Sequence, residues 1–206
     1  MFLSLNLHQL TVLPALRHSM FADRAGQFVD RHRWPLRLDD EGLEVDDYDD
    51  GVATYCIVAA GGHHLASVRH RPVRSGSMTE DHFPGLWREA LRSGVEITRF
   101  CCAPDLSPDQ RLSAVSDLLL GLCRHCQASG IVGIFGIVFP AVARVIRQAG
   151  WPSNILGEIR DQRGTMVLTQ WTPGDLVAWD IQEKRELREE IWTRRRERAQ
   201  IEMLVA

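Results

Sequence analysis

Apolar positions in residues 1–70 follow two spacings, one typical of a helix and one typical of strands. Residues 12–31 carry an apolar stripe at helical spacing, with Pro14 near the start of the stripe, where a helix tolerates proline. Residues 36–50 are rich in Asp, Glu and Gly and predict a loop. The apolar runs 55–60 and 65–69, which a glycine pair separates, predict a hairpin.

Strand-like and helical patterns alternate along the rest of the chain. In chain order, the expected elements are an irregular stretch over 73–86, a short helix near 87–91, a strand over 95–102, a helix over 113–129, a strand over 131–138, a helix over 141–148 and a hairpin of 155–159 with 165–170. Such alternation is typical of a central sheet with helices packed on it. We therefore predict an α/β (α+β) fold, built as a single domain on a mixed sheet.

The composition changes near residue 180. A chain of 206 residues is long enough for one domain with a substantial core and a terminal extension. Residues 183–198 predict a highly charged helix with a sparse apolar stripe. We divide the chain into a domain over 1–179 and a charged helical extension over 180–206. A solvated terminal helix is the simpler interpretation of the extension, and a dimer contact or a surface for an acidic partner is the alternative.

The charge balance argues against several classes of protein. The chain has 24 Lys and Arg against 27 Asp and Glu, a net charge of −3, which gives no reason to expect binding to nucleic acid or to a membrane surface. No apolar run approaches the roughly 18 residues that insertion across a bilayer requires. Residues 1–13 lack the basic region and the cleavage site of a signal peptide, so we expect a cytoplasmic protein.

Five cysteines are scattered through the predicted strands and helices, and this odd number argues against a disulfide framework. Cys123 and Cys126 have CxxC spacing, with His125 between them, but they lie inside an apolar helical run and no second ligand pair follows. We interpret them as small buried residues and predict no metal. His63 and His64 follow the glycine pair and are expected to be exposed turn residues.

Six charged side chains lie within or beside segments that otherwise form a core. They are Arg24, Asp46, Asp49, Arg69, Glu96 and Arg99. Buried charges are costly unless they pair with one another or with a charged ligand. A balanced set of three basic and three acidic groups suits a zwitterionic small molecule better than a nucleic acid.

An ordered set of motifs resembles one known family. The motifs are Arg24-x-x-x-Phe28 with Trp34, then Glu44-x-Asp46-x-x-Asp49, then Val68-Arg69 ahead of Pro72, then Met78 and Phe83, then Glu96-Ile-Thr-Arg99-Phe100. In this order and at these separations they resemble the LuxI-type acyl-homoserine-lactone synthases, from about residue 20 to residue 159. Members of that family make quorum-sensing signals by joining an acyl group, carried as a thioester on acyl carrier protein or coenzyme A, to S-adenosylmethionine.

The resemblance implies a fold similar to the Gcn5-type N-acetyltransferases. It also implies that S-adenosylmethionine is a substrate, that no cofactor is needed, and that methylthioadenosine is released. The methionine part of this substrate carries two cations and a carboxylate, so its pocket needs both anions and a guanidinium. Phe28 and Trp34 are aromatic groups that can wall such a pocket against water. The expected substrate-binding residues are Arg24, Phe28, Trp34, Asp46, Asp49 and Arg69.

Glu96 and Arg99 are the predicted catalytic residues. Acyl transfer requires an unprotonated amine, and a free α-amino group has a pKa of roughly 7.7–8.0, so a base of modest strength suffices. Glu96 is the first candidate for this base, directly or through a water, and Asp49 is the alternative. Residues three apart in a regular strand face opposite sides. A β-bulge between Glu96 and Arg99, as the resemblance implies, or a place at the strand end would let both serve one site.

The resemblance also implies an acyl pocket on the later elements. Its expected lining residues, most of which must also belong to the core, are Phe100, Leu118, Leu122, Gly136, Val138, Val142 and Ile146. Relatives often carry a Thr at the position that Gly136 takes here, which favours an acyl chain without a 3-oxo group. Arg124, Arg144 and Arg147 lie on the expected helices and are candidates to meet an acidic carrier protein.

Two other interpretations stay open. An acyl-CoA-dependent N-acyltransferase acting on a different amine usually carries a glycine-containing loop whose N–H groups hold pyrophosphate. The equivalent stretch 109–115 contains no glycine, which disfavours this alternative. A catalytically inactive relative that only binds S-adenosylmethionine is the second alternative, and the intact set of six charges argues against it.

Overall fold

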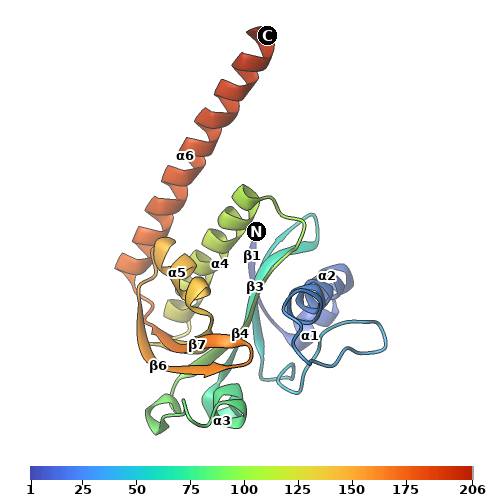
Figure 1. Cartoon of the computed structure of the whole chain (residues 1–206), viewed down its shortest axis with the longest axis vertical. Coiled ribbons are helices and arrows are strands. Elements are labelled where there is room, and N and C mark those ends of the chain that lie inside the picture. Colours follow the sequence, from blue (N-terminus) through green and yellow to red (C-terminus); the bar gives the residue numbers. More distant parts are fainter. Residues whose placement is uncertain (206) are drawn as a thin grey trace.

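A seven-stranded mixed sheet forms the centre of the molecule (Figure 1). The computed structural model describes the backbone of residues 1–205 and the side chains of residues 1–198. In the order β1-β2-β3-β4-β5-β7-β6 all neighbouring strands are antiparallel except β4 and β5, which run parallel. The strands are β1 (Phe2–Asn6), β2 (Thr54–Ala60), β3 (His63–Pro72), β4 (Val95–Cys102), β5 (Ile134–Val138), β6 (Ser153–Asp161) and β7 (Gly164–Trp171).

Helices cover both faces of this sheet (Figure 1). The α-helices are α1 (Leu7–Thr11), α2 (Pro14–Arg24), α3 (Met78–His82), α4 (Pro108–Ala128), α5 (Pro140–Gln148) and α6 (Asp175–Val205). A π-helical segment, Ala25–Arg31, continues α2. Short 3₁₀ turns occur at Val73–Ser75 and Glu89–Leu91. The predicted mixed sheet with flanking helices is therefore confirmed, and the loop over 36–50 contains no regular element.

The alternation of side chains along β2 separates two apolar cores. Tyr55 and Ile57 pack on one face of the sheet against residues of α1 and α2. Cys56 and Val58 point to the opposite face and pack against α4. Because successive residues of a strand face opposite sides, one short apolar run serves both layers. Strand β1, which the sequence pattern did not predict, extends the sheet beside β2.

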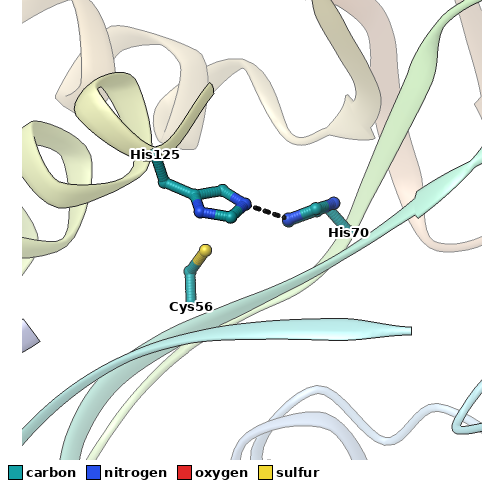
Figure 2. A group of neighbouring side chains, drawn as sticks. All are labelled: Cys56, His70 and His125. Atoms are coloured by element: carbon teal, nitrogen blue, oxygen red, sulfur yellow. Dashed lines mark hydrogen bonds between the residues drawn. The ribbon is translucent and has the colours of Figure 1, made fainter. Parts of the chain in front are cut away.

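Strand β3 divides a charged site from an apolar layer in the same way. Arg69 and His70 are consecutive on β3 and therefore project to opposite faces. His70 lies on the α4 face with Cys56 and His125 (Figure 2). All five cysteines are free and buried, as predicted.

The prediction of an exposed turn is wrong for His64. His64 belongs to β3, and its side chain is buried. Its Nδ1 lies 2.7 Å from Asp23 Oδ2, and its Nε2 lies 2.9 Å from Ser67 Oγ. His63 also belongs to β3, so the turn ends at Gly62, two residues earlier than expected. His63 is exposed as predicted, whereas His64 ties β3 to α2.

Helix α6 begins at Asp175, so the expected division at residue 180 falls inside it. The first turns pack on the domain, where Ile181 is fully buried. Farther along, the helix extends away from the body of the molecule (Figure 1), and Leu187 and Ile191 are exposed. Residue 206 lies outside the described residues. None of the helices in the described part of the chain combines the length and apolar character needed to cross a bilayer.

Candidate active site

A β-bulge in β4 brings the charged residues of this strand to one side. Ser67 pairs with Cys101 and Arg69 pairs with Thr98, so two residues, Arg99 and the following one, oppose a single residue of β3. Arg99 has φ 57°, in the left-handed region that side-chain-bearing residues rarely adopt. The extra residue changes the alternation of β4, which lets Glu96 and Arg99 serve the same site although they are three apart. The predicted bulge is confirmed, and it lies at Arg99 itself.

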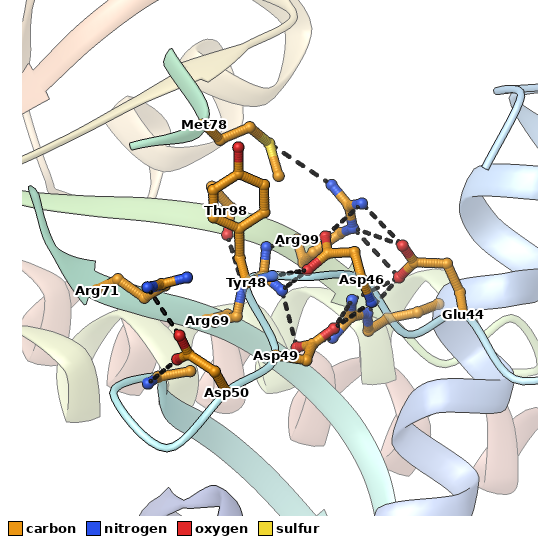
Figure 3. Close-up of polar contacts among 12 residues, drawn as sticks. Glu44, Asp46, Tyr48, Asp49, Asp50, Arg69, Arg71, Met78, Thr98 and Arg99 are labelled. Carbon is orange, nitrogen blue, oxygen red and sulfur yellow. Dashed lines mark hydrogen bonds and ion pairs between the residues drawn. The ribbon is translucent and has the colours of Figure 1, made fainter. Parts of the chain in front are cut away.

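Three arginines and three carboxylates form a closed ring in which positive and negative groups alternate (Figure 3). Each guanidinium contacts two carboxylates, and each carboxylate contacts two guanidinium groups. The formal charges of the six members cancel, which is the arrangement that makes buried charge tolerable. In order around the ring the members are Arg24, Glu44, Arg99, Asp46, Arg69 and Asp49.

Arg24 and Arg99 hold Glu44 between them. The Nε of Arg24 donates to Glu44 Oε2 at 2.7 Å, and its two Nη atoms donate to Asp49 at 2.9 and 2.8 Å. Arg99 Nη2 lies 2.8 Å from Glu44 Oε1 and 2.7 Å from Asp46 Oδ2. Paired N–H donors in the plane of one guanidinium suit carboxylates in this way.

Arg69 closes the ring, and turns in the loop before β2 orient its partners. Arg69 contacts Asp46 through both Nη atoms and Asp49 Oδ1 at 2.8 Å, and its Nε donates to Thr98 Oγ1 at 3.0 Å. The N–H of Asp46 donates to Asp49 Oδ2 at 2.9 Å, and the N–H of Tyr48 donates to Asp46 Oδ1 at 2.9 Å. Such Asx contacts explain why a segment rich in Asp folds as an ordered loop.

The ring favours the charged forms of Asp49 and Arg24. Burial by itself raises the pKa of Asp49, but the charge and hydrogen bonds of Arg24, with the charge of Arg69, outweigh it and hold the pKa well below its usual range. Burial lowers the pKa of Arg24, and the charges of Asp49 and Glu44 outweigh it and raise the pKa. Burial and the adjacent Asp49 raise the pKa of Tyr55, whose hydroxyl donates to Asp49 Oδ1 at 3.1 Å.

Glu96 stands outside the ring. Its Oε2 accepts from the N–H of Met78 at 2.8 Å, and its Oε1 accepts from the N–H and the hydroxyl of Thr79 at 2.8 and 2.6 Å. Glu96 therefore anchors the first turn of α3, where acidic groups are favourable. A carboxylate offers about four acceptor positions, so one on Oε2 stays available.

A cavity of about 510 Å³ opens where β4 and β5 separate. The two parallel strands pair over only two residues each. Gly136 still lies close to Ile97. A Cβ added at residue 136 would stand only 2.6 Å from the Ile97 carbonyl oxygen. Beyond this point the strands diverge, and residues 96–100 and 137–139 both line the cavity.

The cavity lining has a charged side, formed mainly by the loop before β2 and by β4, and an apolar side, formed mainly by the end of β5 and by α5. Arg163 adds a further charge from the turn between β6 and β7. Asp46, Glu96 and Arg99 line the charged side, whereas Arg24, Asp49 and Arg69 lie behind them and do not reach the cavity. Aromatic rings wall it, since Phe28 and Trp34 stack with centroids 5.2 Å apart and Trp34 also contacts Phe139. The guanidinium carbon of Arg99 lies 5.5 Å from the centroid of the Phe28 ring.

Three of the predicted acyl-pocket residues line the apolar side of this cavity, namely Phe100, Val138 and Val142. The structure places Leu118, Leu122 and Ile146 in the core between the sheet and its helices. Gly136 does not line the cavity either, because its backbone packs against Ile97.

The three arginines predicted to meet a carrier protein are exposed. Arg124 on α4 donates from Nη2 to Gln182 of α6 at 2.7 Å. Arg144 and Arg147 lie on the exposed face of α5, the helix that carries Val142 into the cavity wall.

Sequence reasoning missed two residues of the site. Glu44 lies within the acidic motif, but it is not among the six charged residues expected to form the site. Its exposed fraction is 1%, and Arg24 and Arg99 both pair with it. Gln27 bridges the bulged strand, because its Nε2 donates to the carbonyl of Phe100 at 2.9 Å and its Oε1 accepts from the N–H of Cys102 at 3.2 Å. For Glu44, the available signal was its position two residues before Asp46 in the acidic motif.

Comparisons with known proteins find a matching family and related sequences and structures. Residues 9–178 match the family described as autoinducer synthase. An acyl-homoserine-lactone synthase of Rhizobium radiobacter is 28% identical over 167 residues, which cover 76% of this chain and 78% of that protein. The structure of BjaI, a CoA-dependent acyl-homoserine lactone synthase with SAM and isopentyl-CoA, superposes with a TM-score of 0.77 and 19% identity over 90% of this chain and 89% of that chain.

The fold is also similar to that of an acyl-CoA N-acyltransferase from Pseudomonas aeruginosa. The TM-score is 0.54 at 12% identity, covering 82% of this chain and 98% of that chain. At such identities the likeness bears on the fold alone, and it agrees with the expected N-acetyltransferase-like architecture.

Proposed function

The chain belongs to the autoinducer synthase family, and from this premise we propose that it is an acyl-homoserine-lactone synthase. It transfers an acyl group from a thioester of acyl carrier protein or coenzyme A to the amine of S-adenosylmethionine. The acylated substrate then closes to a lactone and releases methylthioadenosine. The product is a quorum-sensing signal, and the enzyme acts in the cytoplasm, where both substrates are made.

The single observation that carries this function is the two-sided cavity between β4 and β5. Its charged side presents Asp46 and Arg99, which suit the ammonium and carboxylate of a zwitterionic amine. Its apolar side presents Phe100, Val138 and Val142, which suit an acyl chain. An amine on one side and a thioester on the other meet near Glu96, at the point where the strands part.

Arg99 is the guanidinium best placed to bind the substrate carboxylate. Arg24 and Arg69 lie behind the cavity with their donors directed at ring carboxylates. Arg99 Nη1 contacts only the weak acceptor Met78 Sδ, at 3.8 Å, among the described residues. A carboxylate in the cavity therefore gains a strong donor without breaking the ring. In this proposal Arg24, Asp49 and Arg69 position Arg99 and Asp46.

Glu96 is the proposed general base of the acylation step. Its remaining acceptor position on Oε2 takes a proton from the substrate ammonium, directly or through one water. The freed nitrogen attacks the thioester carbon and the C–S bond breaks. One of the two protons left on the nitrogen passes to the departing sulfur, so that the carrier leaves as a thiol. Thr79 and the N–H groups of α3 hold the carboxylate in place for this transfer.

Lactone closure needs no group of the protein as a reactant. One carboxylate oxygen of the acylated substrate attacks its own γ-carbon, and the bond from that carbon to the sulfonium breaks. Methylthioadenosine leaves as a neutral thioether. The stacked Phe28 and Trp34 hold the chain in the curled conformation that this intramolecular attack requires.

The test incubates the purified chain with S-adenosylmethionine and a panel of acyl-carrier-protein and acyl-CoA thioesters. We expect methylthioadenosine release that depends on both substrates, with an acyl-homoserine lactone detected by mass spectrometry. Thiol release with other amines but never with S-adenosylmethionine would favour the alternative N-acyltransferase. Binding of S-adenosylmethionine without turnover of any thioester would favour the inactive relative.

A further inference from the structure

Cys56, His70 and His125 form a cluster of metal-ligating side chains away from the cavity (Figure 2). One nitrogen of each imidazole and the Cys56 sulfur lie within 4.8 Å of one another. The two Nε2 atoms are 3.0 Å apart. The residues come from β2, β3 and α4, so three separate elements converge on one point.

This cluster does not belong to the proposed active site. His70 projects from the face of β3 opposite to that of Arg69. Val68, on the same face of β3 as His70, lines the cavity, but His70 itself does not reach it. None of the three residues lines the cavity. The reaction proposed above gives none of them a role.

The surroundings make a merely apolar role costly. Cys56 and His70 are buried, and the apolar residues Val58, Val68 and Leu122 share the core layer of Cys56. Ser4, opposite Cys56 on β1, offers the Cys56 thiol a polar contact. The only polar contact of the His70 ring within the described part of the chain is the one to His125, because His70 Nδ1 is buried without a hydrogen-bond partner. The 3.0 Å contact between the two Nε2 atoms is the polar contact that a cation between the rings would replace, whereas the Nδ1 of His70 has no partner in either case.

We propose that Cys56, His70 and His125 bind a divalent zinc ion that joins α4 to the β2–β3 hairpin. A thiolate with two imidazoles is a ligand set that favours Zn²⁺ over magnesium or calcium, which prefer oxygen. Tetrahedral Zn²⁺ places two nitrogens about 3.3 Å apart and a nitrogen and a sulfur about 3.6 Å apart, given the usual bond lengths. The observed Nε2–Nε2 separation of 3.0 Å is close to the first value, and the nitrogen–sulfur separations of at most 4.8 Å would have to shorten toward the second.

Binding exchanges a proton for the metal. The Cys56 thiol loses its proton to solvent as the Zn–S bond forms, and the imidazoles bind in their neutral form. A water completes the coordination from the side of His125, which is partly exposed.

Equilibrium dialysis of the full untagged chain against Zn²⁺ alone, followed by metal analysis, tests this site. We expect about one zinc per chain, and a higher melting temperature with zinc than with a chelator. Cys56→Ser and His125→Ala should lose the ion, whereas Cys102→Ser and the exposed His63→Ala should keep it. His125 is only partly buried, so His125→Ala is expected to fold, and circular dichroism checks this.

Substitution of Co²⁺ gives a second readout. Wild type and His63→Ala should show a thiolate-to-cobalt charge-transfer band that Cys56→Ser lacks. Absence of tightly held zinc in wild type would overturn the proposal, and so would retention of the ion by His125→Ala. No substrate enters these measurements, so their outcome is independent of the proposed enzyme activity.

Discussion

Glu44 and Arg99 form a buried ion pair in which Nη2 of Arg99 lies 2.8 Å from Oε1 of Glu44, and neither side chain is more than 6% exposed. Glu44 also contacts Arg24 of α2, so this one carboxylate joins a helix on one face of the sheet to the bulge in β4. The charges of the ring cancel only while all six members are present. Loss of a single carboxylate leaves the buried ring with one uncompensated positive charge, which is worse than loss of a complete pair.

Glu44→Gln should therefore destabilise the fold. The amide keeps the shape of the side chain but removes the negative charge between two arginines. We expect a loss of about 3–5 kcal/mol in the free energy of unfolding, measured by urea denaturation near pH 7. The exposed Glu41→Gln, on the same loop, should stay within about 0.5 kcal/mol of wild type. Equal stability of the two variants would show that Glu44 has no structural part in the ring.

The backbone of Arg99 can be tested separately from its guanidinium. Arg99→Ala and Arg99→Gly both remove the side chain, and both should abolish methylthioadenosine release. Only glycine adopts a φ of 57° without steric cost, which for other residues amounts to about 1–2 kcal/mol. Arg99→Gly should therefore be about 1 kcal/mol more stable than Arg99→Ala in urea unfolding. The opposite order would mean that the bulge relaxes once the arginine is gone.

Local patterns in the sequence predicted the elements whose apolar spacing runs over several residues, such as the β2–β3 hairpin and α4. Helices α1 and α3 and strand β1 have five residues each, too few for a period to appear. The charged motifs indicated which residues form the site but not how they pair. The pairing depends on which carboxylates the fold brings next to the arginines. The loop before β2 brings Glu44 to Arg99, whereas Glu96 accepts from the N–H groups of α3 and stays outside the ring.

The acyl-pocket residues show a related limit of spacing arguments. Leu118 and Val142 both lie on apolar helix faces, yet only Val142 reaches the cavity. Nothing in a helical period distinguishes a side chain that fills the core from one that lines an opening in it, because the opening is created by the divergence of β4 and β5.

Glu96→Gln should lower kcat by roughly 10²–10⁴-fold, the range expected for loss of a general base. The amide oxygen of the new side chain can still accept from Thr79, but its NH₂ group would face the Met78 N–H, and two donors cannot form a hydrogen bond. The first turn of α3 should therefore be less firmly held as well. Thr79→Val removes one of the hydrogen bonds and leaves the carboxylate, and a much smaller drop in kcat is expected. The half-buried Glu80→Gln, in the same helix, is the matched control for charge. If Glu96→Gln and Thr79→Val lose the same activity, Glu96 acts by positioning α3 and not as a base.

Acid should weaken the ring through Asp49. Its pKa in the folded chain lies below the value of about 3.9 in an unfolded chain, so below that value the folded state binds fewer protons than the unfolded state. The stabilisation from Asp49 is then complete above about pH 4 and is lost as the pH falls toward the folded pKa.

Asp49→Asn removes the titrating group that faces Arg24, Arg69 and Tyr55. Urea midpoints at about pH 7, 5 and 3 should show the gap between wild type and Asp49→Asn narrowing at the lowest pH only. A constant gap would assign the acid sensitivity to other groups.

Gly136→Ala tests whether the close approach of β4 and β5 sets the cavity. A Cβ at residue 136 would lie 2.6 Å from the Ile97 carbonyl oxygen and 2.9 Å from its Cγ1, so one strand must move. Overpacking of this kind costs about 1–3 kcal/mol, which in a chain of this size lowers the melting temperature by about 2–4 °C per kcal/mol. Gly133→Ala is the matched control, because its Cβ meets Gln170 Nε2 at an ordinary 3.6 Å.

The wider separation of the strands in Gly136→Ala should also change KM for the acyl thioester more than KM for S-adenosylmethionine, since the apolar side of the cavity borders β5. A melting temperature equal to that of Gly133→Ala, with unchanged KM for both substrates, would mean that the position of these strands is determined elsewhere in the sheet.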